Sequence, residues 1–163
     1  MVSPVLAGDG TPAQGMITAP VAGLVRWLEG WPAGLVLLAL RLWIGSIFFR
    51  SGLLKVENFA SAQFLFAEVH PVPFLPPALA ASLATGFELL CPILLALGLL
   101  TRLAALPLLA MALVIQFVVG AADPAFWQTE HYYWMLLLAV LVTKGAGALS
   151  LDALIAQRSG LRL

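Results

Sequence analysis

The chain is dominated by long apolar runs, and the longest of them holds a single charge. Residues 76–100 are almost all apolar, with Glu88 near the middle. A helix of that length is about 37 Å long, enough to cross the hydrocarbon core of a bilayer with some tilt. A carboxylate at a helix centre in the membrane costs about 2.5–3.5 kcal/mol, so we expect Glu88 to face the interior beside a partner. Arg41, midway along the preceding apolar run, is the predicted partner in a buried ion pair.

The composition supports a membrane protein. Of 163 residues, 62% are hydrophobic and only 10% are charged, with a mean hydropathy of +1.02, whereas soluble domains carry about 25% charged residues. We predict an all-α, polytopic membrane protein: an antiparallel bundle of four transmembrane helices, surrounded by the lipid bilayer. The predicted spans are 32–51, 76–100, 103–121 and 131–149.

The segments outside the spans have distinct patterns. Residues 1–20 lack the features of a signal peptide and predict a flexible cytoplasmic tail, and residues 153–163 predict a polar, basic cytoplasmic tail. Trp27 and Trp31 flank the first span and predict a short interfacial helix within 21–31. Between the first two spans, residues 58–69 predict an amphipathic helix on the membrane surface, with one apolar face. That face consists of Phe59, Ala62, Phe66 and Val69, and it lies opposite Asn58 and Glu68.

The distribution of basic residues predicts the orientation. Four spans place both termini and the short Thr101–Arg102 turn on one side of the membrane. That side collects five basic residues against two on the other, which favours cytoplasmic termini. The five are Arg26, Arg102, Lys144, Arg158 and Arg162, and the two are Arg50 and Lys55. Over the whole chain eight basic residues balance eight acidic ones, so no basic surface indicates binding to nucleic acid.

Several kinds of chemistry are excluded by residue counts. The single cysteine, Cys91, rules out an intramolecular disulfide, a CxxC redox pair and a cysteine-rich metal site. We expect it to pack in the core. The only histidines are His70, in a proline-rich loop, and His131, so no haem-ligand pair is visible. We therefore predict no metal site and no covalently bound cofactor.

Three segments together resemble the DoxX family of small four-helix membrane proteins, over roughly residues 35–152. The first is Arg41-Leu-Trp-Ile-Gly45, followed by Phe48, Phe49, Gly52 and Lys55. The second is Glu88, followed by Leu97-Gly-Leu-Leu-Thr-Arg102. The third is Lys144-Gly-Ala-Gly-Ala-Leu-Ser-Leu-Asp152, which departs from the family pattern at Ala146, where the family has proline, and at Ala148, where it has arginine.

The resemblance implies a location and partners. Named relatives are similar to membrane subunits of sulfur- or thiol-linked oxidoreductases that pass electrons to quinone. For this chain it implies a bacterial or archaeal plasma membrane, partner proteins that carry the redox centres, and a quinone as the possible bound ligand. Formation of a homo-oligomer and the presence of any catalytic activity stay open, and no catalytic residue is identified.

Five polar residues near the non-cytoplasmic ends of the spans form the predicted ligand pocket. Basic, amide and imidazole groups there could hydrogen-bond the carbonyls of a quinone or an anionic substrate, and His131 could carry a proton. The alternative is that these groups only sit among the lipid headgroups. The five are Arg50, Lys55, Gln116, Glu130 and His131.

Three classes of function compete. In the first, the chain is a non-autonomous oxidoreductase subunit that holds a quinone. In the second, it is a transporter-like bundle in which Arg41 and Glu88 line a path for a proton or a small molecule. In the third, it is a scaffold that anchors a partner protein, and the Arg41–Glu88 pair is purely structural.

Overall fold

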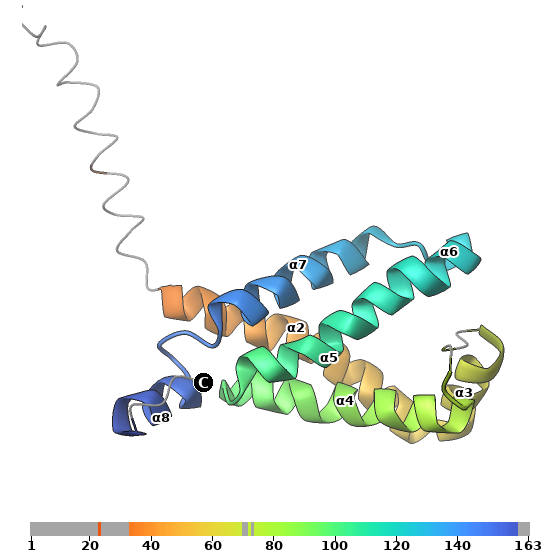
Figure 1. Cartoon of the computed structure of the whole chain (residues 1–163), viewed down its shortest axis with the longest axis horizontal. Coiled ribbons are helices and arrows are strands. Elements are labelled where there is room, and N and C mark those ends of the chain that lie inside the picture. Colours follow the sequence, from red (N-terminus) through yellow and green to blue (C-terminus); the bar gives the residue numbers. More distant parts are fainter. Residues whose placement is uncertain (1–22, 24–32, 70–71, 73, 160–163) are drawn as a thin grey trace, which may run out of the picture. The chain divides into compact units, whose positions relative to one another are not determined.

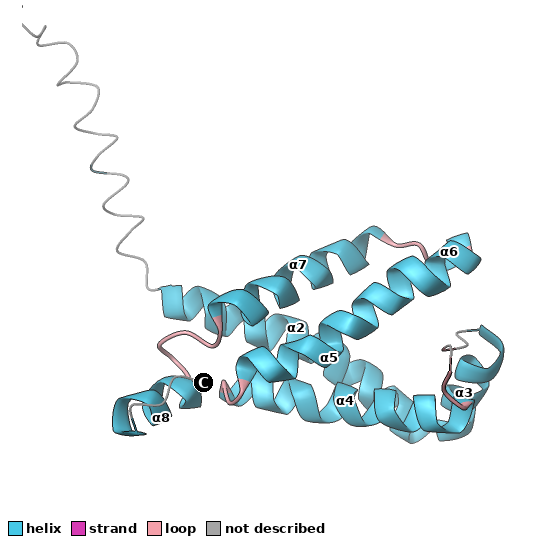
Figure 2. Cartoon of the chain, in the orientation of Figure 1, coloured by secondary structure: helices cyan, strands magenta, loops and turns pink. Residues whose placement is uncertain are grey.

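The computed structural model describes residues 23, 33–69, 72 and 74–159. In this part of the chain every element is a helix (Figure 2). The four main helices are α2 (Ala33–Glu57), α4 (Pro77–Leu97), α5 (Thr101–Val114) and α7 (Thr129–Lys144). They form the predicted antiparallel all-α bundle (Figure 1). The predictions for residues 1–20 and for the interfacial helix within 21–31 lie outside the described residues, apart from Gly23, as do residues 160–163 of the second tail.

Three of the helices are long and apolar enough to cross a membrane among the residues described. They are Ala33–Glu57, Pro77–Leu97 and Thr101–Ala122. The third is composite, because α5 continues through a π-helical turn, η2 (Ile115–Val119), into α6 (Gly120–Ala122). The fourth predicted span, α7, has 16 residues and is about 24 Å long, shorter than a hydrocarbon core of about 30 Å.

Three helix ends differ from the predicted span boundaries. The first span was expected to end at residue 51, but α2 continues to Glu57. The second was expected to reach residue 100, but α4 ends at Leu97, because Gly98 adopts a left-handed conformation with φ of 66°. This conformation ends the helix with backbone hydrogen bonds to Leu94 and Leu95. The fourth span was expected to end at residue 149, but α7 ends at Lys144, because Gly145 has a positive φ of 76°.

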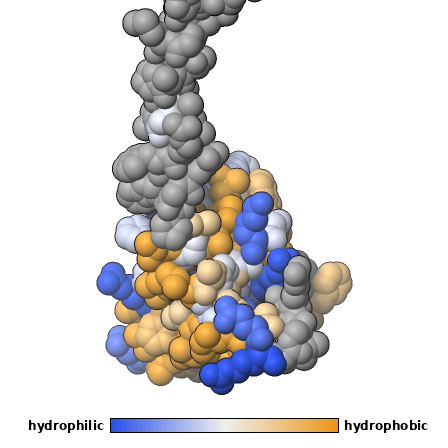
Figure 3. Space-filling model, turned by 90° about the vertical axis from the view of Figure 1, so that its left-hand side faces the viewer, coloured by the Kyte–Doolittle hydropathy of each residue, from blue (hydrophilic) through white to orange (hydrophobic). Residues whose placement is uncertain are grey.

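The bundle core is apolar and closely packed. It is built around Ile44 and Phe48 of α2, Leu95 of α4, Leu108 of α5 and Leu138 of α7. Cys91 is buried among them, as predicted. The opposite faces of the same helices carry large apolar side chains, such as Trp43, which is 67% exposed. In a bilayer these faces contact lipid. Figure 3 looks onto the left-hand side of Figure 1, where hydrophobic and hydrophilic residues are interspersed on the surface.

The predicted amphipathic helix is confirmed as α3 (Phe59–Phe64) followed by a π-helical turn, η1 (Leu65–Val69). The side chain of Asn58 caps its first turn by accepting a hydrogen bond from the Ser61 amide at 3.1 Å. Ala62 is buried and the rest of the predicted apolar face is half-buried, whereas Asn58 and Glu68 are exposed.

The two ends of the bundle are built differently (Figure 1). We call one the α8 end; it holds the start of α2, the turn between α4 and α5, the loop 145–150 and α8 (Leu151–Ser159). We call the other the α3 end; it holds α3, the start of α4, α6, the short 3-10 helix η3 (Pro124–Phe126) and the start of α7.

Candidate functional site

Seven polar or charged side chains are buried in the described part of the bundle. A buried polar group costs free energy unless it is hydrogen-bonded, so each of them needs a partner. Six of them fall into three groups: an ion pair between α2 and α4, a cluster at the α8 end, and a hydrogen-bonded pair between η2 and α7. Thr85 alone bonds within its own helix, to the Ala81 carbonyl. The seven are Arg41, Thr85, Glu88, Thr101, Gln116, His131 and Asp152.

Glu88 pairs with Lys55. The Lys55 Nζ lies 2.6 Å from Glu88 Oε2 and donates a second hydrogen bond, 2.8 Å long, to the hydroxyl of Ser51. Gly52 lets the two helices approach at this level, because a Cβ built on it would lie only 3.0 Å from the Cβ of Glu88. The carboxylate in the middle of α4 therefore has the cationic partner that its burial requires.

The predicted ion pair between Arg41 and Glu88 is wrong. The register of the antiparallel helices places Gly52 against Glu88, while Arg41 lies against the far end of α4. Eleven residues separate Arg41 from Gly52, about 16 Å along a helix. The prediction placed both charges at mid-membrane because it ended the first span at residue 51; α2 continues for six more residues and brings Lys55 to Glu88 instead.

Arg41 is completely buried and binds backbone carbonyl groups. Its Nη1 donates to the Leu95 carbonyl at 3.2 Å, and its Nη2 donates to the carbonyl of Leu149. The guanidinium thus ties α2 to the last turn of α4 and to the loop before α8. The carboxylate of Asp152 also acts on it electrostatically.

Asp152 closes the turn between α4 and α5. Its carboxylate accepts hydrogen bonds from the backbone amides of Leu100, at 2.8 Å, and Thr101, at 3.1 Å, and its own amide donates to the carbonyl of Gly98 at 2.9 Å. A carboxylate on the first amides of a helix satisfies unpaired donors and complements the helix dipole. Sequence reasoning missed this role, although Asp152 closes the third DoxX-like segment.

Residues from each of the three DoxX-like segments therefore meet at the α8 end. Arg41 comes from the first, Gly98 and Thr101 from the second, and Ser150 and Asp152 from the third. Ser150 caps α8, because its hydroxyl accepts a hydrogen bond from the Ala153 amide at 3.1 Å. The hydrogen bonds of this cluster hold helices and loops together, while two of its buried atoms, Arg41 Nε and Thr101 Oγ1, have no hydrogen-bond partner among the described residues.

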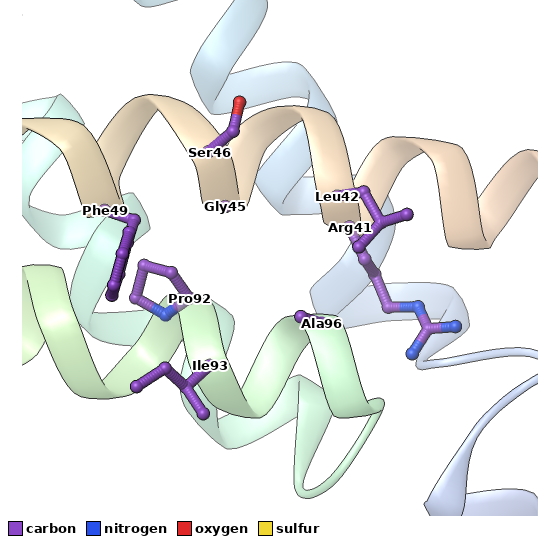
Figure 4. A pocket seen from close by; sticks show the side chains of 8 residues that line it. All are labelled: Arg41, Leu42, Gly45, Ser46, Phe49, Pro92, Ile93 and Ala96. Carbon is purple, nitrogen blue, oxygen red and sulfur yellow. The ribbon is translucent and has the colours of Figure 1, made fainter.

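A pocket of about 270 Å³ lies between α2 and α4 beside Arg41 (Figure 4). Its polar groups are the Arg41 side chain, whose guanidinium points away from the other labelled residues, and the Ser46 hydroxyl, which already donates to the Trp43 carbonyl at 2.8 Å. The remaining lining is apolar, so the pocket suits a hydrocarbon chain better than a polar group. It is lined by Arg41, Leu42, Gly45, Ser46, Phe49, Pro92, Ile93 and Ala96.

Gln116 and His131 form a buried hydrogen-bonded pair near the α3 end. The Gln116 Oε1 lies 2.7 Å from His131 Nδ1, and the His131 ring packs against Trp134 with centroids 4.9 Å apart. Gln116 lies in the π-helical turn η2, a kind of turn that often occurs at functional sites. Its Nε2 is buried and has no hydrogen-bond partner among the described residues. An unsatisfied buried donor costs about 1–3 kcal/mol, and a bound acceptor would relieve this cost.

The five residues of the predicted pocket separate into three kinds. Gln116 and His131 are hydrogen-bonded to each other, while Lys55 is paired with Glu88. Arg50 and Glu130 are exposed, and Glu130 acts on the neighbouring His131 electrostatically. The polar candidate site is therefore the Gln116–His131 pair. Among the residues described, no group of three or more His, Cys, Asp or Glu side chains is arranged to hold a metal ion.

Comparison with known proteins identifies the family. The model of the DoxX family matches residues 36–121. An uncharacterized protein of Haemophilus influenzae is 36% identical over 138 residues, which cover 78% of this chain and 88% of that protein. No solved structure matches. The chain is a membrane protein that belongs to the DoxX family.

Proposed function

We propose that this chain is the membrane subunit of a quinone-linked oxidoreductase assembly and that Gln116 and His131 hold the quinone. The observation that carries the proposal is the buried pair itself: a glutamine in a π-helical turn, hydrogen-bonded to a histidine of α7, with one amide donor left unpaired. The oxygen of a quinone carbonyl is an acceptor of the kind that this donor lacks.

The proposal gives each side chain a role. Because Gln116 Oε1 can only accept, the hydrogen bond to it is donated by His131 Nδ1. The His131 Nε2 is then the nitrogen that can accept or return a proton at neutral pH. Gln116 Nε2 would donate to a carbonyl oxygen, so the pair combines a donor with a group that exchanges protons. A bound quinone would supply the two-electron chemistry that neither side chain has.

Partner proteins complete the proposed assembly. The chain has one cysteine, buried in the core, so it does not carry the four cysteine ligands of an iron–sulfur cluster of its own. Electrons would reach the quinone from a flavin, metal or thiol centre on another subunit. The scaffold function is the alternative, and it requires no ligand at Gln116.

We propose a plasma membrane location with the α8 end in the cytoplasm. Among the described residues, the exposed charges at the α8 end are the basic Arg102, Lys144 and Arg158. The exposed acidic residues lie toward the α3 end: Glu57, Glu68, Asp123 and Glu130. Basic residues concentrate on the cytoplasmic side of membrane proteins.

The test is to measure quinone that purifies with the protein in its native lipids, by solvent extraction and chromatography. We expect quinone to be present in the parent and to fall about ten-fold in Gln116→Leu and in His131→Phe, because each loses a buried hydrogen bond worth about 1.4 kcal/mol. Glu130→Gln, one residue from His131 and exposed, is the matched control and should keep its quinone. A parent protein without quinone, or equal retention in all variants, would favour the scaffold function.

A further inference from the structure

The α8 end carries a basic and apolar surface that no part of the proposed quinone function uses. Its exposed charged side chains in the described chain are Arg102 at the start of α5, Lys144 at the end of α7 and Arg158 in α8. Asp152 is the acidic residue of the same region, and it is buried, with its carboxylate on backbone amides. The surface is therefore basic without an exposed acidic side chain among the residues described.

Two of these basic residues, Arg102 and Lys144, come from neighbouring helix ends. A Cβ built on Gly145 would lie 3.2 Å from Arg102 Nε, so the Arg102 guanidinium lies against the residue that follows Lys144. Both residues stand at the ends of membrane helices, the level at which lipid phosphates are found. Long basic side chains at that level extend toward the headgroups.

The helix α8 adds an apolar stripe to the same surface. Leu151, Leu154 and Ile155 follow the i, i+3, i+4 spacing of one helix face. Leu154 is 51% exposed and Leu151 is 37% exposed, so the stripe is only partly covered by the bundle. Arg158 follows on the same face, seven residues after Leu151, so the apolar stripe ends in a basic side chain. With this face toward the membrane, the leucines would contact the acyl chains and the long Arg158 side chain would extend to the headgroups.

We propose that the α8 end is a binding surface for anionic phospholipids, with α8 lying in the interface and Arg102, Lys144 and Arg158 holding lipid phosphates. Charge complementarity identifies the occupant, because these three basic groups have no exposed acidic neighbour among the described residues and, in the proposed orientation, they face the leaflet that contains anionic lipids. The hydrogen bond from the Asp152 amide to Gly98 keeps the start of α8 against the bundle. Each basic residue near a charged leaflet contributes about five-fold in affinity.

Native mass spectrometry of the full-length protein released from mixed-lipid nanodiscs tests this proposal. The nanodiscs contain phosphatidylcholine and phosphatidylglycerol, and the measurement is the ratio of the two lipids that remain bound. We expect the parent to retain phosphatidylglycerol preferentially. The triple variant Arg102→Gln, Lys144→Gln, Arg158→Gln should lose at least ten-fold of that preference, and Arg50→Gln, which removes an exposed arginine from the other half of α2, should not.

Two further measurements guard against a misfolded variant. The charge-retaining variant Arg102→Lys, Arg158→Lys should keep the preference, and all variants should show the same helix content by circular dichroism. Equal binding of the two lipids by the parent, or an unchanged preference in the triple variant, would overturn the proposal. An acidic protein surface would then be the occupant that fits this end of the bundle.

Discussion

Single side chains decide where this bundle tolerates charge. Glu88, in the middle of α4, is 3% exposed, and it forms an ion pair with Lys55 in the last turn of α2. We predict that Lys55→Leu lowers the free energy of unfolding by about 3 kcal/mol, since it leaves the buried Glu88 carboxylate unpaired, and that Glu88→Leu lowers it by less, because the half-buried Lys55 can extend to solvent. The double variant should recover part of the loss, as measured by reversible unfolding in mixed micelles.

The same measurement separates the observed pair from the one that the sequence suggested. Arg41→Gln and Glu88→Gln should have additive effects on the free energy of unfolding. The two residues lie on different helices, at different levels of the bundle, and are not in contact. A coupling of more than about 1 kcal/mol between Arg41 and Glu88 would contradict the observed register.

At the scale of the element, the turn between α4 and α5 depends on two residues far apart in the chain. Gly98 has φ of 66°, and an added Cβ there would overlap the Arg41 guanidinium. We predict that Gly98→Ala destabilises the protein by more than 2 kcal/mol, from backbone strain and displacement of Arg41. The matched control is Gly86→Ala in α4, where a Cβ meets nothing within 4 Å; it should stabilise by about 0.5–1 kcal/mol.

Asp152 supports the same turn from the other side. Asp152→Ala removes both acceptors from the Leu100 and Thr101 amides and should cost about 2 kcal/mol, at the upper end for a helix cap because the site is buried. Asp123→Ala removes a comparable but exposed cap from η3 and should cost less than half as much. Thermal unfolding followed by circular dichroism measures the loss of stability in both variants. Equal losses would show that burial of Asp152 does not strengthen its cap relative to the exposed cap of Asp123.

Elements could be predicted from the sequence better than contacts. Apolar length and periodicity were sufficient for the helices and for the amphipathic segment at 58–69, because helix formation in a membrane depends on local composition. Lys55 and Asp152 were assigned no partner, because their contacts depend on the register of α2 against α4 and on the return of the loop 145–150. Gln116 and His131 were predicted to lie in one region, and they form a hydrogen bond with each other. The pattern did not predict that Lys55, from the same predicted pocket, pairs with Glu88 instead.

At the scale of the whole molecule, the two ends of the bundle face different environments. With the basic α8 end in the cytoplasm, Ser61 in α3 should be accessible from outside the cell and Gln157 in α8 should not. In a Cys91→Ala background, an impermeant maleimide should label Ser61→Cys in intact cells, and should label Gln157→Cys only after permeabilisation. The reverse pattern would invert the topology.

Photoaffinity labelling tests the proposed binding of a quinone at the Gln116–His131 pair most directly. The purified protein is irradiated with an azidoquinone in its native lipids, and the modified peptides are identified by mass spectrometry. We predict labelling within residues 115–134, competed by excess unmodified quinone and reduced about ten-fold in Gln116→Leu, which loses one buried hydrogen bond. Labelling confined to the pocket beside Arg41, or labelling that excess quinone does not compete, would contradict the account.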